Sequence, residues 1–369
     1  MHDASNQLYM VNQNKSSAYR RKRAAMKKIK VLPYGVGVVG GFITKFLLEK
    51  DGVEIVGAVD VAKDKVGKDL GQVLGLKKEI GVKISDNIGS ALSKSKADVA
   101  IHATSSYLRD TYSQIASIVE HGVNVVSTCE ELSYPYVSEP KLAKRLDALA
   151  KKHDVTVLGT GINPGFLMDA LVITLTAPCQ SVEKVEATRV MNAATRRLPF
   201  QKKIGAGLSV EEFTHKIEKK HITGHVGLEQ SIAMVADALA WKLDKIVVES
   251  VEPVVAKKPV QSKDIKVKSG KVAGLKQRAK GMIRGKEAIV LDFRAYIGAE
   301  EEYDAVTIKG VPEIREKISP CVHGDLATVA MIVNSIPKVI NAPAGLLTMK
   351  DLPVPSAALE DMRKYLKQT

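Results

Sequence analysis

Cysteine and tryptophan are scarce in this sequence of 369 residues, which contains three Cys and one Trp. Cys129, Cys179 and Cys321 are too few and too widely spaced for a disulfide framework or a C-x-x-C motif. The sequence also contains no H-E-x-x-H pattern and no Cys/His cluster, so we predict no metal site. Free thiols fit a reducing compartment, and we therefore expect a cytoplasmic protein.

Long apolar runs are also missing. A helix that crosses a membrane needs about 20 apolar residues, and the longest candidate, "GFLMDALVITLTAP", is shorter and is interrupted by Asp169. Asp and Glu are fewer than Lys and Arg, which gives a net charge of +14. Much of this excess lies in "RRKR" at 20–23 and in the tract 256–286, which has no aromatic residue to stack on a base. We therefore predict that the protein binds neither a membrane nor a nucleic acid. An alternative role for the basic tract 256–286 is to line a cleft that attracts an anionic cofactor.

The sequence does contain a regular alternation of buried strands and amphipathic helices, which runs from residue 28 to about residue 160. Apolar runs such as "KIKVLPYG", "ADVAIHATSS" and "VTVLGTG" alternate with helical patterns such as "YLRDTYSQIASIVEHG". This rhythm predicts βαβ units around a parallel sheet. After Gly161 the strands become longer and more alternating, which predicts an open mixed or antiparallel sheet. The predicted fold class is α/β, with an N-terminal Rossmann domain and an α+β substrate domain.

These patterns divide the chain into four segments. Residues 1–25 are polar and end in basic residues just before Met26, and this composition fits a disordered extension, a targeting leader or an upstream alternative start. Residues 26–160 form the predicted dinucleotide-binding domain. Residues 161–324 form the predicted substrate and oligomerisation domain. Residues 325–369 begin with a helical pattern and are expected to return to the Rossmann domain.

A glycine-rich loop follows the first predicted strand and opens a helix. Gly35, Gly37 and Gly40 have the spacing G-x-G-x-x-G, and Asp60 ends the second strand. In this context the glycines permit a tight turn, close approach of a pyrophosphate and close helix packing, while the acid accepts the ribose hydroxyls. We predict a bound nicotinamide dinucleotide. Asp60 favours NAD, but Lys63 or Lys65 could pair with the 2′-phosphate of NADP, so both cofactors stay open.

Polar residues follow three of the predicted strands, where an open α/β sheet binds its ligands. They occur in "ATSS" (103–106), "STCEELSYPY" (127–136) and "GTGINPGF" (159–166). Either Glu130 or Glu131 could serve as a general base under the nicotinamide, or could be a solvated loop charge or helix cap. Asn163 and Pro164 are expected to open the next helix, with Asn163 as its N-cap or as a cofactor contact. The predicted cofactor contacts are Gly35, Gly37, Val38, Val39, Gly40, Asp60, Lys63, Thr104, Ser105, Ser106, Thr128 and Asn163.

Six segments together resemble the 2,4-diaminopentanoate dehydrogenases and the similar native amine dehydrogenases, which share a dihydrodipicolinate-reductase-like fold. They are "YGVGVVG", "GAVD", "STCEELSYPY", "LGTGINPGFLMDALV", "GHVGLEQSIAMVADALAWKLD" and "HGDLATVAMIVNSIPKVINAPAGLLTMKDLP". The resemblance extends from about Lys28 to Pro353. It implies NAD(P)-dependent reductive amination of a small ketone with ammonia, and the reverse deamination of a 2,4-diaminopentanoate-like or short aliphatic amine. We also predict a homodimer, because substrate domains with open sheets in such enzymes commonly bury one exposed apolar sheet face against a second subunit.

The resemblance further implies a catalytic glutamate in the "EE" pair, which we assign to Glu130 with Glu131 as the alternative. A substrate carboxylate would need a cation, and Arg189 on a predicted strand is the candidate, although it could equally be a surface residue. His225 and His323 lie beside glycines and either line the pocket or have structural roles. The predicted substrate contacts are Tyr134, Phe166, Arg189, Asn192, His225 and His323.

Three alternatives remain at this point. Reduction of dihydrodipicolinate would need a histidine- and lysine-bearing motif, for which we find no clear equivalent. A non-catalytic NAD(P) sensor would keep the glycine loop but would not need a carboxylate at the nicotinamide. Nucleic-acid binding by the basic tracts would depend strongly on salt.

Overall fold

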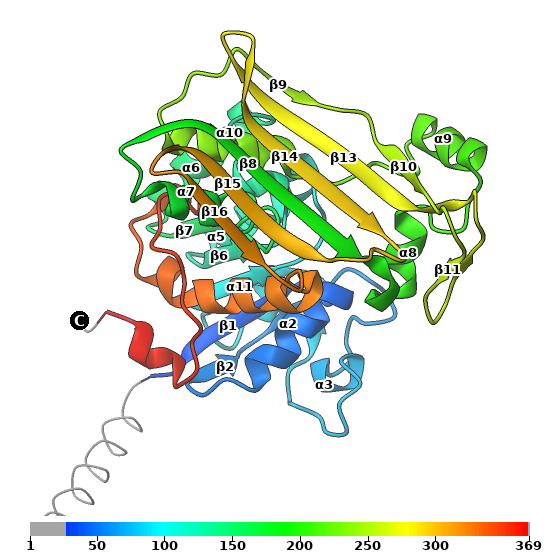
Figure 1. The fold of residues 1–369 in the computed structure, drawn as a ribbon. Helices are drawn as coiled ribbons and strands as arrows, with labels where there is room; N and C mark the ends of the chain where they lie inside the picture. The colour runs from blue at the N-terminus through cyan, green and yellow to red at the C-terminus, as the bar shows by residue number, and fades with distance from the viewer. Residues whose placement is uncertain (1–26, 368–369) are drawn as a thin grey trace, which may run out of the picture.

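The computed structural model describes residues 27–367, and the predictions for residues 1–25 lie outside this range. The described chain forms two layered domains around two separate sheets (Figure 1). In the described residues the first sheet has eight strands, all paired in parallel, in the order β17-β7-β6-β5-β1-β3-β4 with β2 also beside β1. Its strands are β1 (Ile29–Tyr34), β2 (Val53–Ile55), β3 (Ala58–Val59), β4 (Ile84–Ser85), β5 (Val99–His102), β6 (Asn124–Ser127), β7 (Thr156–Gly159) and β17 (Gly345–Leu347).

Helices connect these strands and bury them on both faces, which is why the strands read as continuous apolar runs. Val31, Val99 and Val157 are fully buried in the sheet. Amphipathic α5 and α6 pack against each other and against the sheet. The helices of this part are α2 (Val38–Leu48), α3 (Leu70–Val73), α4 (Ile88–Ala91), α5 (Leu108–Glu120), η1 (Glu131–Ser133) and α6 (Pro140–Lys152).

The second domain is built on a mixed sheet of seven described strands in the order β10-β13-β14-β8-β15-β16, with β9 beside β13. Only the β14–β8 pair is parallel in this sheet as described. The strands are β8 (Ser181–Asn192), β9 (Lys245–Val248), β10 (Glu252–Val255), β13 (Val272–Ile283), β14 (Lys286–Tyr296), β15 (Tyr303–Val311) and β16 (Ile314–Ile318), and a separate hairpin is formed by β11 (Val260–Gln261) and β12 (Lys266–Val267). The structure thus contains the open mixed sheet that the alternating sequence pattern predicts.

Helices α7 (Ala170–Thr176) and α10 (Leu228–Ala238) cover the inner face of this sheet, while Figure 1 shows its outer face turned toward the viewer. Shorter elements lie at one end: η2 (Ala193–Thr195), α8 (Leu198–Lys203) and α9 (Val210–Glu218). The chain then returns to the first domain. Helix α11 (Gly324–Ile340) packs on α2 and β6, β17 extends the first sheet beside β7, and η3 (Met362–Tyr365) packs against α11.

The structure corrects one predicted helix start. Asn163 and Pro164 lie in a turn, and the helix begins only at Ala170. Asp169 is the N-cap: its buried carboxylate accepts hydrogen bonds from the N–H groups of Ala170 (2.6 Å) and Gly165 (2.8 Å). Asn163 is therefore available to the cavity described next.

Candidate active site

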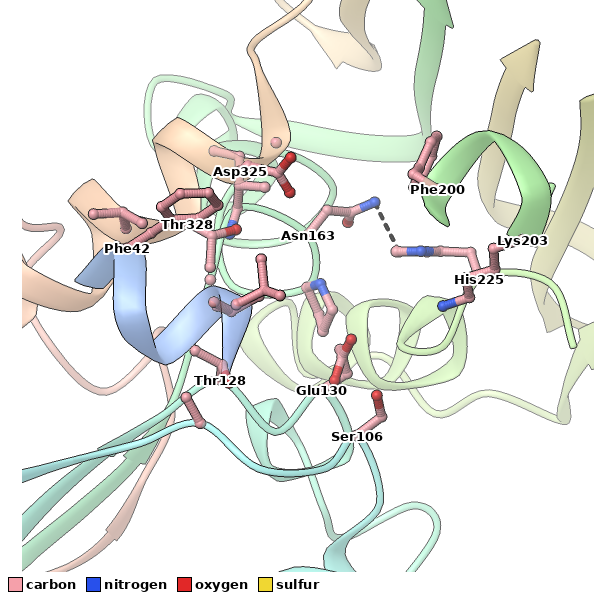
Figure 2. Close-up of a pocket in the computed structure, with 18 of the residues that line it drawn as sticks. Phe42, Ser106, Thr128, Glu130, Asn163, Phe200, Lys203, His225, Asp325 and Thr328 are labelled. Carbon is pink, nitrogen blue, oxygen red and sulfur yellow. Dashed lines mark hydrogen bonds between the residues drawn. The ribbon is translucent and has the colours of Figure 1, made fainter. Parts of the chain in front are cut away.

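A cavity of about 420 Å³ opens where the ends of β5, β6 and β7 face the second domain. The glycine loop and the start of α2 line one side of it, and the segments after β5, β6 and β7 line its floor. The second domain contributes residues from β8, α8 and β14, and α11 contributes its first turns. Figure 2 shows Phe42 and Thr328 on one side of this cavity and Phe200 and Lys203 on the other. The cavity thus lies at the carboxyl ends of parallel strands, where open α/β sheets bind ligands.

The glycine loop has the geometry that a dinucleotide phosphate requires. Gly35 has a φ of +91°, and a Cβ on Gly40 would lie 1.9 Å from the Gly35 carbonyl oxygen. Helix α2 starts at Val38, and Gly37 at its N-cap has no heavy atom within 4 Å of a built Cβ. The backbone N–H groups at the start of α2 therefore face open space, where a helix N-terminus attracts phosphate. These residues fit the pyrophosphate of a nicotinamide dinucleotide.

Asp60, the residue predicted to contact the ribose, directly follows β3. Its carboxylate accepts hydrogen bonds from the N–H groups of Val36 (2.8 Å) and Ala62 (2.9 Å) and pairs with Lys65 Nζ (2.9 Å). Burial acts to raise the pKa of Asp60, but these hydrogen bonds and the Lys65 charge outweigh it and lower that pKa below its usual value. Lys65 is thus the lysine that turns toward Asp60, whereas Lys63 is exposed.

The ends of β5 and β6 are held together by a histidine that sequence reasoning missed. Buried His102 bonds through Nδ1 to Ser127 Oγ (2.8 Å) and through Nε2 to Gln114 Oε1 (2.9 Å) and Thr104 Oγ1 (3.0 Å). Burial lowers the pKa of His102 to about 4, so this histidine is neutral. It lies in the apolar run "DVAIHAT", where the pattern indicates only a buried strand. Thr104, with Ser105, Ser106 and Thr128, lines the cavity floor.

Glu130 projects into this cavity, and Figure 2 shows its carboxylate between Ser106 and Asn163. It lies in the segment after β6, just before η1. Burial raises the pKa of Glu130 above its usual value, while the Ser106 hydroxyl and the positive charge of Lys203 oppose this rise. A carboxylate with a raised pKa is suited to accept and return protons near neutral pH.

Glu131 points elsewhere. Its carboxylate accepts a 2.8 Å hydrogen bond from the Leu108 N–H at the first turn of α5. Glu131 does not line the cavity. Adjacent side chains of the "EE" pair thus separate, with one on the cavity and one on a helix N-terminus, where a negative charge stabilises the helix.

Asn163 and His225 form a fixed polar pair above Glu130. Asn163 Nδ2 donates to His225 Nε2 (3.0 Å), the contact marked in Figure 2. The imidazole is half-buried and stacks on Phe293 with 4.5 Å between the ring centroids. Desolvation and the nearby charges of Arg189 and Lys203 lower the pKa of His225 to about 3, so it is neutral. The pairing leaves Asn163 Oδ1, and nearby Thr160 Oγ1, buried with no hydrogen-bond partner among the described residues. Both oxygens belong to cavity-lining residues and are suited to accept from a ligand N–H.

Arg189 also lines the cavity, but its guanidinium is already paired. Nη1 donates to Asp304 Oδ1 at 2.9 Å, and Nη2 donates to the Val322 carbonyl. Both partners are buried, with side-chain exposures of 2% and 5%. Burial lowers the pKa of Arg189 and raises that of Asp304, so each charge depends on the other.

Four other predicted substrate contacts lie outside this cavity. The Tyr134 ring packs edge-on against Tyr136, 5.4 Å away. Phe166 packs on the hydrophobic core below α7. Asn192 Oδ1 accepts from the N–H groups of Ala194 and Gly298 and so fixes the end of β8. His323 caps α11 and lines a neighbouring apolar cavity.

The second domain and α11 also bring to the cavity side chains that are not among the predicted site residues. Arg196 pairs with Asp325 at 2.9 Å and stacks over the Phe200 ring at 4.8 Å. Lys203 enters from the end of α8. None of these lies in a pattern that distinguishes it from a surface residue in the sequence.

Two other features are absent from residues 27–367. No group of three or more His, Cys, Asp or Glu side chains in this range is arranged to hold a metal ion. No helix in the described chain combines the length and apolar character that a membrane span requires.

Both halves of the chain match domains of known protein families. Residues 29–132 match the N-terminal domain of dihydrodipicolinate reductase, and residues 166–368 match the C-terminal domain of 2,4-diaminopentanoate dehydrogenase. A 2,4-diaminopentanoate dehydrogenase from Acetoanaerobium sticklandii is 39% identical over 350 residues, covering 93% of this chain and 98% of the relative. A 4-hydroxy-tetrahydrodipicolinate reductase from Prochlorococcus marinus is 26% identical over only 41% of this chain and 53% of its own length.

A solved structure gives the same result for the fold. An amine dehydrogenase from Mycobacterium smegmatis is 29% identical and superposes with a TM-score of 0.75, covering 90% of this chain and 98% of that protein. The C-terminal match is decisive, because the N-terminal domain is shared with reductases of other substrates. The chain belongs to the 2,4-diaminopentanoate dehydrogenase family.

Proposed function

We propose that the protein is a nicotinamide-dependent amine dehydrogenase that interconverts a small amine with its ketone and ammonia. The observation that supports this most directly is the carboxylate of Glu130, which has a raised pKa and faces the cavity at the strand ends. Family membership supports the same reaction type, because both named relatives that cover nearly the whole chain are amine dehydrogenases.

The dinucleotide, when bound along the glycine loop, supplies the hydride for amination and accepts it for deamination. Glu130 takes a proton from ammonium so that ammonia attacks the ketone carbonyl. The same group then returns a proton to the carbinolamine hydroxyl, which leaves as water. The Glu130 carboxylate next stabilises the cationic iminium that receives the hydride. The overall balance is ketone plus ammonium plus reduced cofactor giving amine, water and oxidised cofactor.

Asn163 and Thr160, which lie in the segment after β7 and line the same cavity, support this role. Each has a buried oxygen without a partner among the described residues, and amine N–H groups are donors that would satisfy them. His225 holds the Asn163 amide nitrogen, so the amide oxygen is the atom left for a ligand.

A test is an initial-rate assay with NADH or NADPH, ammonium and a panel of small ketones. Cofactor oxidation should require both ammonium and ketone, and the reverse reaction should require the amine. Oxidation that proceeds at the same rate without ammonium would favour an ordinary ketone reductase instead.

We further propose that both cofactors are used, with the balance set by Asp60 and Lys65. Asp60→Ser should raise the ratio of kcat/KM for NADPH over NADH, because the acid that disfavours a 2′-phosphate is lost. Lys65→Met should lower that ratio, while exposed Lys63→Met is the matched control. Steady-state kinetics with both cofactors measures the ratio, and an unchanged ratio in both variants would exclude this placement.

We propose that the protein is a homodimer that uses the outer face of the second sheet. No described helix covers this face, although its side chains are largely charged rather than apolar, as in the chain of ion pairs from Lys184 through Glu287 to Lys280. Alternating charges of this kind can pair across a two-fold axis. Light scattering at micromolar concentration should give twice the chain mass, and Lys280→Glu should shift the mass toward the monomer. A wild-type monomer would contradict the proposal.

A further inference from the structure

Buried His102 connects three strand ends beneath the cavity. In the first sheet, His102 on β5 lies beside Tyr34 on β1 and beside Ser127 on β6. The centroids of the Tyr34 and His102 rings are 5.5 Å apart, and Gly35 of the glycine loop directly follows Tyr34. His102 is fully buried and does not line the cavity. Any effect of His102 on the reaction must therefore pass through the residues that it contacts.

The hydrogen bonds of His102 fix which ring nitrogen carries the proton. Nε2 lies 2.9 Å from Gln114 Oε1, which can only accept, so Nε2 carries the proton and donates in this bond. Nδ1 is then an acceptor, and the Ser127 hydroxyl donates to it at 2.8 Å. Since His102 stays neutral, one side of its ring donates and the other side accepts.

The accepting side of the ring leads to Glu130. Because the Ser127 hydroxyl proton points at Nδ1, its oxygen is free to accept from the Cys129 N–H, at 3.1 Å. This bond fixes the turn after β6, immediately before Glu130. The buried Cys129 thiol also donates to the Ser106 carbonyl, at 3.3 Å, and the Ser106 hydroxyl interacts with the Glu130 carboxylate. His102 thus orients the backbone that carries Glu130 through one intermediate side chain.

The donating side of the ring leads to the glycine loop. Gln114 on α5 also accepts from the Thr104 hydroxyl at 2.7 Å, and Nε2 lies 3.0 Å from that hydroxyl. Thr104 lines the cavity, and its methyl group lies 2.8 Å from the position that a Cβ on Gly35 would occupy. The donating side of the ring thus holds a side chain that packs beside the proposed dinucleotide site.

We propose that His102 is a positioning residue with two separable roles: its Nδ1 orients the turn that carries Glu130, and its Nε2 holds Thr104 beside the cofactor. This proposal rests on the proposed amine dehydrogenase function. The two roles can be removed one at a time, because the amide of Asn takes approximately the place of Nδ1 and the amide of Gln that of Nε2. His102→Asn can still accept from Ser127, and His102→Gln can still donate to Gln114.

His102→Gln should lower kcat for amination by roughly 10- to 100-fold, since a displacement of about 1 Å at the reacting groups can cost this much. Its dissociation constant for NADH, measured by fluorescence quenching, should stay near that of the wild type. His102→Asn should show the reverse. Its dissociation constant should rise by roughly 2- to 10-fold, the usual effect of one lost hydrogen bond, while its kcat at saturating cofactor falls much less than in His102→Gln.

His121→Gln and His121→Asn are the matched controls, because His121 is an exposed histidine at the C-cap of α5 and does not line the cavity. Both should keep the wild-type values.

Two further variants break the same links without changing His102. Ser127→Ala should reproduce the loss of kcat, and Thr104→Val should reproduce the loss of NADH affinity. The double variant His102→Gln with Ser127→Ala should lower kcat no further than either change alone, because both changes break one link.

Parallel losses of kcat and NADH affinity in His102→Gln and His102→Asn would reduce His102 to a structural residue and overturn the proposal. The reverse split, or wild-type kinetics in both variants, would also overturn it. If these two variants do not fold, the same comparison between Ser127→Ala and Thr104→Val decides the outcome.

Amide hydrogen exchange tests the positioning role independently of the reaction. His102→Gln should speed exchange in the peptide that contains Cys129, because the acceptor of its N–H is no longer oriented, and His121→Gln should not. If the wild type aminates no ketone, the proposed function fails, and exchange still decides the role of His102. Wild-type exchange at Cys129 in His102→Gln would contradict that role.

Discussion

Glu130→Gln is expected to reduce kcat for reductive amination by roughly 10²–10⁴-fold, which corresponds to about 3–5 kcal/mol of transition-state stabilisation. Gln keeps the size and one hydrogen-bond acceptor but can neither take a proton from ammonium nor stabilise a cationic iminium. The dissociation constant of NADH, measured by fluorescence quenching, should change little, because the phosphates face the glycine loop and not Glu130.

The stability of this variant should move in the opposite direction from its activity. Burial raises the pKa of Glu130 in the folded protein. A carboxyl group with a raised folded-state pKa stabilises the fold below its unfolded pKa, and this contribution is lost as pH rises through the folded-state pKa. At neutral pH the ionised Glu130 side chain therefore destabilises the folded protein. Glu130→Gln should leave the thermal midpoint unchanged or raise it. A large fall would mean that the loss of activity reflects misfolding.

Glu131→Gln provides the matched control. Its carboxylate accepts the Leu108 N–H, and Gln can accept the same bond while losing only the favourable charge at the start of α5. Activity should therefore fall much less than in Glu130→Gln. A variant pair in which Glu131→Gln is inactive and Glu130→Gln is active would reverse the assignment, and two active variants would exclude a carboxylate mechanism.

Arg189→Met is expected to reduce the free energy of unfolding by about 3–5 kcal/mol, because it leaves Asp304 buried without its counter-charge. Arg189 and Asp304 face each other across β8 and β15. The guanidinium also donates a hydrogen bond to the Val322 carbonyl in the segment before α11. The substitution should therefore also destabilise the packing of α11 on the first domain. The thermal midpoint should fall by about 4–6 °C for a chain of this length.

The double variant Arg189→Met with Asp304→Leu separates this structural role from substrate binding. Replacing both members of a buried ion pair by apolar residues is often close to neutral, so most of the lost stability should return. The ratio of kcat/KM for 4-oxopentanoate over 5-methylhexan-2-one, a neutral ketone in which an isopropyl group replaces the carboxylate, should remain near that of the wild type. A normal thermal midpoint in Arg189→Met together with a raised KM for the acid alone would return Arg189 to the role of carboxylate contact.

Local patterns in the sequence were sufficient to predict the fold and the part of the candidate site that lies on the first sheet. The glycine loop, Asp60 and the strand ends follow from spacing and alternation, because these features act within one βαβ unit. Strand β8 coincides with the segment "SVEKVEATRVMN", whose alternating pattern reports one buried face. The separation of Glu130 from Glu131 also follows locally, since adjacent side chains point apart.

The other residues of the candidate site could not be predicted from local patterns, because contacts between segments that are distant in the sequence bring them together. Lys203 and Asp325 come from different elements more than a hundred residues apart, and both resemble surface charges in the sequence. Arg189 appeared free for a ligand because its partner, Asp304, lies on a strand 115 residues later. Asn163 appeared to be a helix cap because Asn commonly has that role, but the buried Asp169 takes it through two short hydrogen bonds.

The most direct test of the central claim is isotopic. Wild-type protein is incubated with a reduced nicotinamide cofactor, ¹⁵N-ammonium and 4-oxopentanoate or 5-methylhexan-2-one, and the products are analysed by mass spectrometry. The account predicts an amine that carries the ¹⁵N label, formed in a one-to-one ratio with oxidised cofactor, and a rate reduced by two or more orders of magnitude in Glu130→Gln. An alcohol product, or labelled amine formed at the same rate by Glu130→Gln, would contradict it.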